Sequence, residues 1–146
     1  MKKRLLSCIV CICMVLCSLN AVVFAKDSET IVILYENDVH CAVEGYSKLV
    51  AMKNELKTDY EYVGVVSSGD FIQGGTLGSA STGEYIVNLM NIVGYDAIGL
   101  GNHEFDYCID RLDELYELSE TKFISCNFAK IGEEKTYFEP YSMVSY

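Results

Sequence analysis

The chain has 146 residues, 21 acidic and 11 basic, with a formal net charge of −10. All the acidic residues but only 8 of the basic ones lie beyond residue 25, so residues 26–146 carry a formal charge of −13. This balance argues against nucleic acid or an anionic membrane as a partner. An acidic surface is more often simply solvated than a site that binds cations. The length of residues 26–146 suits one domain of ordinary size.

The first 25 residues have the pattern of a secretory signal peptide. Residues 2–4 are basic, residues 5–24 form an apolar run, and Ala25 provides a small residue for cleavage. An uncleaved membrane anchor is the alternative, because the run is long enough to span a bilayer. The polar residues that follow Ala25 favour cleavage. We therefore expect a secreted protein, extracellular or held in the cell envelope, whose residues 26–146 lie outside the membrane.

Beyond that segment the chain keeps three of its seven cysteines, Cys41, Cys108 and Cys126. An odd number without regular spacing is not typical of a disulfide scaffold, and no C-x-x-C pattern indicates a zinc site. One disulfide could form, and none is required.

The first half of the remaining chain predicts a strand, a helix and a second strand. Residues 30–35 form a continuous β-branched and apolar run, which is typical of a strand buried on both faces. Apolar residues at near-helical spacing predict a helix over 46–57. Residues 62–66 then predict a second buried strand.

A glycine-rich loop is expected at 74–79, followed by a helix. It is not a P-loop, because no Gly-Lys-Ser or Gly-Lys-Thr follows it. Ser81 and Glu84 have the spacing of a capping box. The apolar positions that follow have the periodicity of an amphipathic helix: Ile86, Leu89, Met90 and Val93. Gly94 is expected to end this helix in a left-handed conformation.

The second half continues the alternation. Residues 96–100 predict a short third strand and residues 109–116 a third helix. Residues 123–125 predict a fourth strand, and residues 137–144 the start of another, broken by the only proline. Strands and helices alternating over connections of this length predict an α/β fold with a largely parallel sheet.

Three polar clusters follow predicted strands directly. They are Asn-Asp-Val-His at 37–40, Ser-Gly-Asp at 68–70 and Gly-Asn-His-Glu at 101–104. The carboxyl ends of parallel strands meet at one edge of the sheet, so we expect the clusters to converge there. Oxygen donors and imidazole gathered at such an edge suit a pair of divalent cations that activate water for phosphate chemistry.

The first two clusters offer candidate metal ligands. Asp38 and His40 are two residues apart, so both could face one cation, although such a pair alone is ordinary loop polarity. Asp70 follows Gly69, whose conformational freedom lets the backbone approach a ligand closely. The two oxygens of Asp70 could bridge cations about 3.5–4 Å apart. The ordinary alternative is that Asp70 caps a turn.

The third cluster offers a further ligand and an acid. Asn102 could give a neutral amide oxygen to a metal, or serve as a left-handed turn residue. His103 could donate a proton or a charged hydrogen bond to the leaving oxygen of a phosphate ester. Asp106, three residues on, could orient the imidazole and favour its protonated form.

In combination these motifs resemble the 5′-nucleotidase branch of the calcineurin-like metallophosphoesterases. The motifs are those at 37–40, Gly-Asp-Phe-Ile-Gln-Gly at 69–74 and Gly-Asn-His-Glu-Phe-Asp at 101–106. Gln-Gly at 73–74, where the broader pattern often has Arg-Gly, points to the nucleotidase branch. The resemblance covers roughly residues 30–127 and matches the amino-terminal half of the catalytic domain. It implies a sandwich of two sheets flanked by helices, of which this chain would supply a part.

The resemblance also implies a role for each site residue. Asp38 and His40 would bind a first divalent metal, such as Zn or Mn, Asp70 would bridge both metals, and Asn102 would bind the second. His103, paired with Asp106, would stabilise the phosphoryl group of a nucleotide or other phosphate ester during in-line attack by water.

The family's later histidine ligands have no counterpart, because His40 and His103 are the only histidines. We therefore expect residues 26–146 to be an incomplete catalytic domain with an incomplete second metal site, completed by a carboxy-terminal part of the same enzyme. A non-catalytic secreted cation-binding or interaction remnant is the alternative from another class. Cyclic-nucleotide phosphodiesterase and sugar-nucleotide hydrolase are the alternatives among enzymes.

Overall fold

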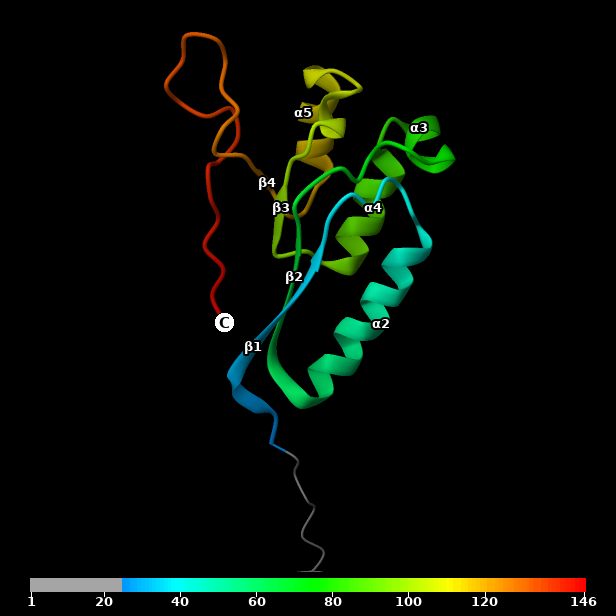
Figure 1. The fold of residues 1–146 in the computed structure, drawn as a ribbon, viewed down its shortest axis with the longest axis vertical. Helices are drawn as coiled ribbons and strands as arrows, with labels where there is room; N and C mark the ends of the chain where they lie inside the picture. The colour runs from blue at the N-terminus through cyan, green and yellow to red at the C-terminus, as the bar shows by residue number, and fades with distance from the viewer. Residues whose placement is uncertain (1–24) are drawn as a thin grey trace, which may run out of the picture.

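The computed structural model describes residues 25–146, which form a four-stranded sheet and its helices (Figure 1). The elements in chain order are β1 (Asp27–Glu36), α2 (Glu44–Asp59), β2 (Tyr60–Ser67), α3 (Thr76–Ser81), α4 (Glu84–Val93), β3 (Ala97–Gly99), the 3₁₀ turn η1 (His103–Phe105), α5 (Ile109–Leu118) and β4 (Phe123–Ile124). This order confirms the predicted α/β alternation. The predicted signal peptide and its anchor alternative lie outside the described residues, except for Ala25.

The sheet has the order β1-β2-β3-β4, and every pair of neighbours is parallel. Its register pairs Glu36 with Ser67 and Ser67 with Ile98. The last residues of β1, β2 and β3 therefore lie at the same edge of the sheet. This confirms the predicted parallel sheet and places the three polar clusters at that edge.

The core lies between the sheet and the helices that cover one of its faces. Val65, Ile98 and Phe123 contribute from the strands, and Ile86 and Leu115 from the helices; each is at most 1% exposed. Figure 1 shows α2 and α4 on one side of the sheet and the C-terminal segment on the other. Burial of these side chains stabilises the fold through the hydrophobic effect.

The outer face of β1 corrects the prediction that this strand is buried on both faces. Ile31, Ile33 and Tyr35 are 54%, 46% and 65% exposed. β1 is an edge strand, and its outer face has no helix against it. The C-terminal segment contacts the neighbouring strand β2, where the ring of Tyr146 packs edge to face against Tyr62 at 6.0 Å. An uninterrupted apolar run cannot distinguish a strand covered on both faces from one covered on a single face.

The segment between β2 and α4 also differs from prediction. The expected loop at 74–79 contains the start of α3, and Ser81 is the last residue of α3 and not the N-cap of α4. Gly83, at φ 90°, is the N-cap of α4, because the chain reverses sharply between the two helices. The Ser81 Oγ donates to the Leu77 carbonyl at 2.8 Å and accepts the N–H of Tyr85 at 3.2 Å. Gly94 ends α4 at φ 70°, as predicted.

No further strand forms at 137–144. Glu139 makes one isolated parallel bridge to Ile124, and Pro140, which follows it, has no N–H with which to extend the ladder. The three cysteines of the described chain are free, with Cys41 buried. Among residues 25–146, no helix combines the length and the apolar character needed to cross a membrane.

The two isoleucines of α4 test the position of the core. Ile86 is fully buried and Ile92 is 75% exposed. We expect Ile86→Ala to lower the free energy of unfolding by about 2–5 kcal/mol, because it leaves a cavity. Ile92→Ala should change it by less than about 0.5 kcal/mol. Urea unfolding followed by circular dichroism measures both, and equal losses would contradict this packing.

Candidate metal centre

The parallel pairing of β1 and β2 continues into the loops that follow them. The N–H of Asp38 donates to the Gly69 carbonyl at 3.2 Å, and the N–H of His40 donates to the Asp70 carbonyl at 2.9 Å. Adjacent strands lie about 4.8 Å apart. This backbone pairing therefore holds the first cluster within ligand distance of the second.

Four residues of these loops other than glycine have left-handed backbone conformations. Asp38, His40 and Asp70 have φ values of 54°, 45° and 60°. Positive φ is uncommon for residues other than glycine, and it persists where the surrounding structure fixes the chain, often at functional sites. These three residues are predicted metal ligands, and the fourth left-handed residue is Cys41, at φ 61°.

The side chains of Asp38, His40 and Asp70 form a group able to hold a cation. Each offers one ligand atom, and the three atoms lie within 4.8 Å of one another. The His40 Nε2 lies 3.9 Å from Asp38 Oδ1. Two carboxylates and an imidazole are suitable donors for a divalent ion such as Zn²⁺ or Mn²⁺. The donor set therefore fits the predicted metal.

The ring of His40 is oriented by a backbone group. Its Nδ1 lies 3.1 Å from the carbonyl oxygen of Gln73, which can only accept, so we assign the proton to Nδ1. The Nε2 atom on the Asp38 side then carries the lone pair. A metal-binding histidine typically has its other ring nitrogen fixed in this way.

The third cluster packs directly on the second, through two glycines. A Cβ atom at Gly69 would overlap the backbone nitrogen of Gly101, and a Cβ atom at Gly101 would overlap the carboxylate of Asp70. The N–H of His103 donates to Asp70 Oδ1 at 2.9 Å. The preceding residue, Asn102, therefore lies on the chain segment that contacts Asp70.

His103 and Asp106 form the predicted pair. The His103 Nδ1 lies 2.7 Å from Asp106 Oδ2, and the two rings of His103 and His40 have centroids 5.0 Å apart. The hydrogen bond to Asp106, followed by the charges of Asp106 and Asp70, raises the pKa of His103. His103 therefore keeps its proton to higher pH than a free histidine.

Asp70 is held in its ionised form. Partial burial opposes its charge, but the N–H of His103, the neighbouring Asp38 and the charge of His103 outweigh burial and lower the pKa of Asp70. A carboxylate that is ionised at neutral pH is ready to bind a cation. The clusters at the sheet edge thus combine an ionised ligand with an imidazole whose pKa is raised.

Glu104 is a functional candidate that lies in the third cluster but to which the sequence pattern assigns no role. It is fully buried, and its carboxylate accepts backbone N–H groups from the second and third clusters. A buried glutamate of this kind has no sequence signature, because its partners are backbone groups that any residue supplies.

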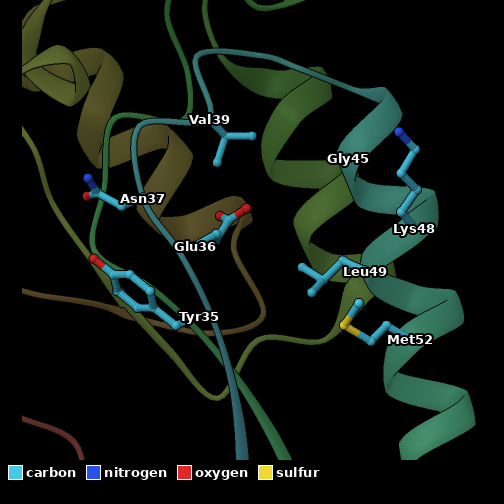
Figure 2. Close-up of a pocket in the computed structure, with 8 residues that line it drawn as sticks. All are labelled: Tyr35, Glu36, Asn37, Val39, Gly45, Lys48, Leu49 and Met52. Atoms are coloured by element: carbon cyan, nitrogen blue, oxygen red, sulfur yellow. The ribbon is translucent and has the colours of Figure 1, made fainter.

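A groove of about 510 Å³ lies beside the site, between β1 and α2 (Figure 2). It is lined by Glu36, Val39, Leu49 and Met52 among others, and by none of the predicted ligands. Burial raises the pKa of Glu36. The candidate metal centre is therefore at the open sheet edge and not in this groove.

The family model of the calcineurin-like phosphoesterases matches residues 31–142. The chain belongs to this family. A snake venom 5′-nucleotidase from Gloydius brevicauda is 30% identical over 83% of this chain and 24% of its own length. A 2′,3′-cyclic-nucleotide 2′-phosphodiesterase/3′-nucleotidase from Haemophilus influenzae is 24% identical over 73% of this chain and 18% of its own length. The chain thus spans a quarter or less of these relatives.

Solved structures have the same fold. The calcineurin-like phosphoesterase YfkN from Bacillus subtilis has a TM-score of 0.67 at 24% identity, covering 77% of this chain and 41% of that one. The Haemophilus influenzae NAD nucleotidase has a TM-score of 0.66 at 26% identity, covering 80% of this chain and 24% of that one. The resemblance inferred from the motifs is confirmed for family and fold. The roles of the individual site residues stay predictions.

The link between Asp106 and His103 can be measured directly. In Asp106→Asn we expect the pKa of His103 to fall, because the hydrogen-bonded carboxylate that raises it is removed. The protonated form of His103 would then be lost at lower pH than in the wild type. NMR titration of the ring protons measures this, and His40, the only other histidine, provides a comparison in each spectrum. An unchanged His103 titration would contradict the assigned pair.

Proposed function

We propose that this chain supplies the amino-terminal half of the dimetal centre of a nucleotide phosphoesterase of 5′-nucleotidase type. The supporting observation is that Asp38, His40 and Asp70 converge within 4.8 Å in a calcineurin-like phosphoesterase. Relatives described as 5′-nucleotidases support a nucleotide phosphate ester as the substrate.

The proposed site has two unequal halves. Asp38 and His40 would hold one divalent ion, with Asp70 shared between two ions and Asn102 directed to the second. When bound, divalent cations polarise phosphoryl oxygens and lower the pKa of coordinated water. The second ion has fewer donors from this chain, since both histidines of the sequence are already assigned.

The remaining residues act on the phosphoryl group. Protonated His103, held by Asp106 at 2.7 Å, would donate a charged hydrogen bond to an oxygen of the ester as negative charge develops there. The N–H of His103 on Asp70 Oδ1 keeps this imidazole next to the ligand carboxylates. Positioning and charge stabilisation account for most catalysis of phosphoryl transfer, and these residues supply both.

The missing donors would come from a carboxy-terminal part of the same enzyme. We propose an extracellular or cell-envelope location, supported by the signal-like sequence of residues 1–25. The formal charge of −13 on residues 26–146 argues against nucleic acid as the substrate.

Titration with Mn²⁺ tests the metal half of this proposal. We expect the folded chain to bind Mn²⁺ and Asp70→Asn to weaken binding by about 10-fold or more, because a ligand loses its charge. Asparagine tolerates the left-handed conformation at this position, so the backbone should be preserved. Asp113→Asn is the control, because Asp113 lies on α5 and is not a predicted ligand. Its carboxylate accepts a hydrogen bond from the Tyr137 hydroxyl at 2.7 Å. Equal affinity in wild type and Asp70→Asn would contradict the site.

Phosphate release from adenosine monophosphate tests the catalytic half. With Mn²⁺ present, we expect this chain alone to hydrolyse the ester only slightly above the level of Mn²⁺ without protein. Strong turnover that His103→Ala abolishes would contradict the incomplete second site. Tight Mn²⁺ binding without turnover, in this chain and in a chain extended by the carboxy-terminal part, would identify a non-catalytic cation-binding remnant.

A further inference from the structure

Glu104 is a buried charge whose partners are backbone N–H groups. Its side chain is 0% exposed, and it takes part in none of the ion pairs among residues 25–146. Its Oε1 accepts the N–H of Phe71 at 2.8 Å and of Ile72 at 3.4 Å. Its Oε2 accepts the N–H of Asp70 and of Gly101, both at 2.7 Å. These four bonds compensate for the cost of burying the charge.

The four donors come from two different clusters. Asp70, Phe71 and Ile72 follow β2, whereas Gly101 and Glu104 itself belong to the segment after β3. One carboxylate therefore joins the segment that bears the bridging ligand to the segment that bears Asn102 and His103.

The backbone of Asp70 is consequently fixed on both sides. Its N–H donates to Glu104, and its carbonyl accepts the N–H of His40 at 2.9 Å. These bonds hold the left-handed conformation at φ 60°, which a non-glycine residue adopts only at a cost in energy. With its backbone held in this way, the side chain of Asp70 accepts the N–H of His103 and lies near the ligand atoms of Asp38 and His40.

We propose that Glu104 is a positioning residue, which sets the geometry of the metal centre by fixing Asp70 against the Asn102–His103 segment. This inference rests on the proposed metal centre. Glu104 is buried behind the ligands and does not itself bind the metals. It acts through the backbone of Asp70 and Gly101.

The chemistry of the four hydrogen bonds indicates which substitution tests the positioning role of Glu104. Each carboxylate oxygen accepts two N–H groups, and only an acceptor on both atoms can do so. Glu104→Gln keeps the size of the side chain but turns an NH₂ group toward two of these N–H donors. We therefore expect the predicted metal ligands to shift in position, although none of them has been substituted.

Asp96→Asn is a matched control. Asp96 Oδ2 also accepts a backbone N–H, that of Val65 at 2.7 Å, but it precedes β3 at the edge of the sheet opposite the clusters. Asp96→Asn keeps an acceptor oxygen but removes the negative charge that strengthens this bond, so it weakens the fold without touching the site. It therefore separates an effect on stability from an effect on metal geometry.

The experiment measures Mn²⁺ affinity and the thermal midpoint for the wild type and both variants, at a temperature where each is folded. We expect both variants to lower the midpoint, but only Glu104→Gln to weaken Mn²⁺ binding, by about 10- to 100-fold. Wild-type affinity in folded Glu104→Gln, or equal weakening in Asp96→Asn, would overturn the positioning role.

A third variant decides the question if Glu104→Gln does not fold. Glu104→Asp keeps two acceptor oxygens but withdraws them by one methylene, so it should fold and still weaken Mn²⁺ binding. Unchanged affinity in Glu104→Asp would then overturn the inference. A wild-type chain that binds no Mn²⁺ would instead contradict the proposed metal centre itself.

Discussion

The structure depends on the parallel pairing of β1 and β2 beyond the ends of the two strands. Two backbone hydrogen bonds, from Asp38 to Gly69 and from His40 to Asp70, extend the ladder into loops that would otherwise diverge. The strands fix the spacing of these loops, and buried residues such as Val65 fix the strands. Hydrophobic burial on one face of the sheet therefore determines where the predicted metal ligands lie at its edge.

The site also shows what this placement costs. Left-handed aspartates and a histidine, a buried carboxylate and two glycines in direct contact each reduce stability or limit substitution. Together they form one backbone network in which the loops after β1, β2 and β3 hold each other. A calcineurin-like phosphoesterase gains from such a network because phosphoryl transfer requires charges that are already in place.

The sequence predicts the fold and the site to different depths. Sequence patterns placed the four strands and the helices α2, α4 and α5 but missed α3, and the rule that parallel strands end at one edge brought Asp38, His40 and Asp70 together. The prediction that β1 is buried on both faces was wrong, because an apolar run does not show what covers each face of a strand. The prediction that Ser81 is the N-cap of α4 was wrong, because Ser81 ends α3 and Gly83 is the N-cap, although the Ser81 hydroxyl accepts the N–H of Tyr85 in the first turn of α4. The bonds of Glu104 depend on tertiary structure alone, so no local pattern predicts them.

The most direct measurement of the central claim is anomalous X-ray scattering from a crystal of this chain soaked in Mn²⁺. Convergence of the loops after β1 and β2 predicts a manganese peak bounded by Asp38, His40 and Asp70, at the carboxyl edge of the sheet. A crystal with bound manganese elsewhere, or with these three side chains turned away from one another and no peak between them, would contradict it.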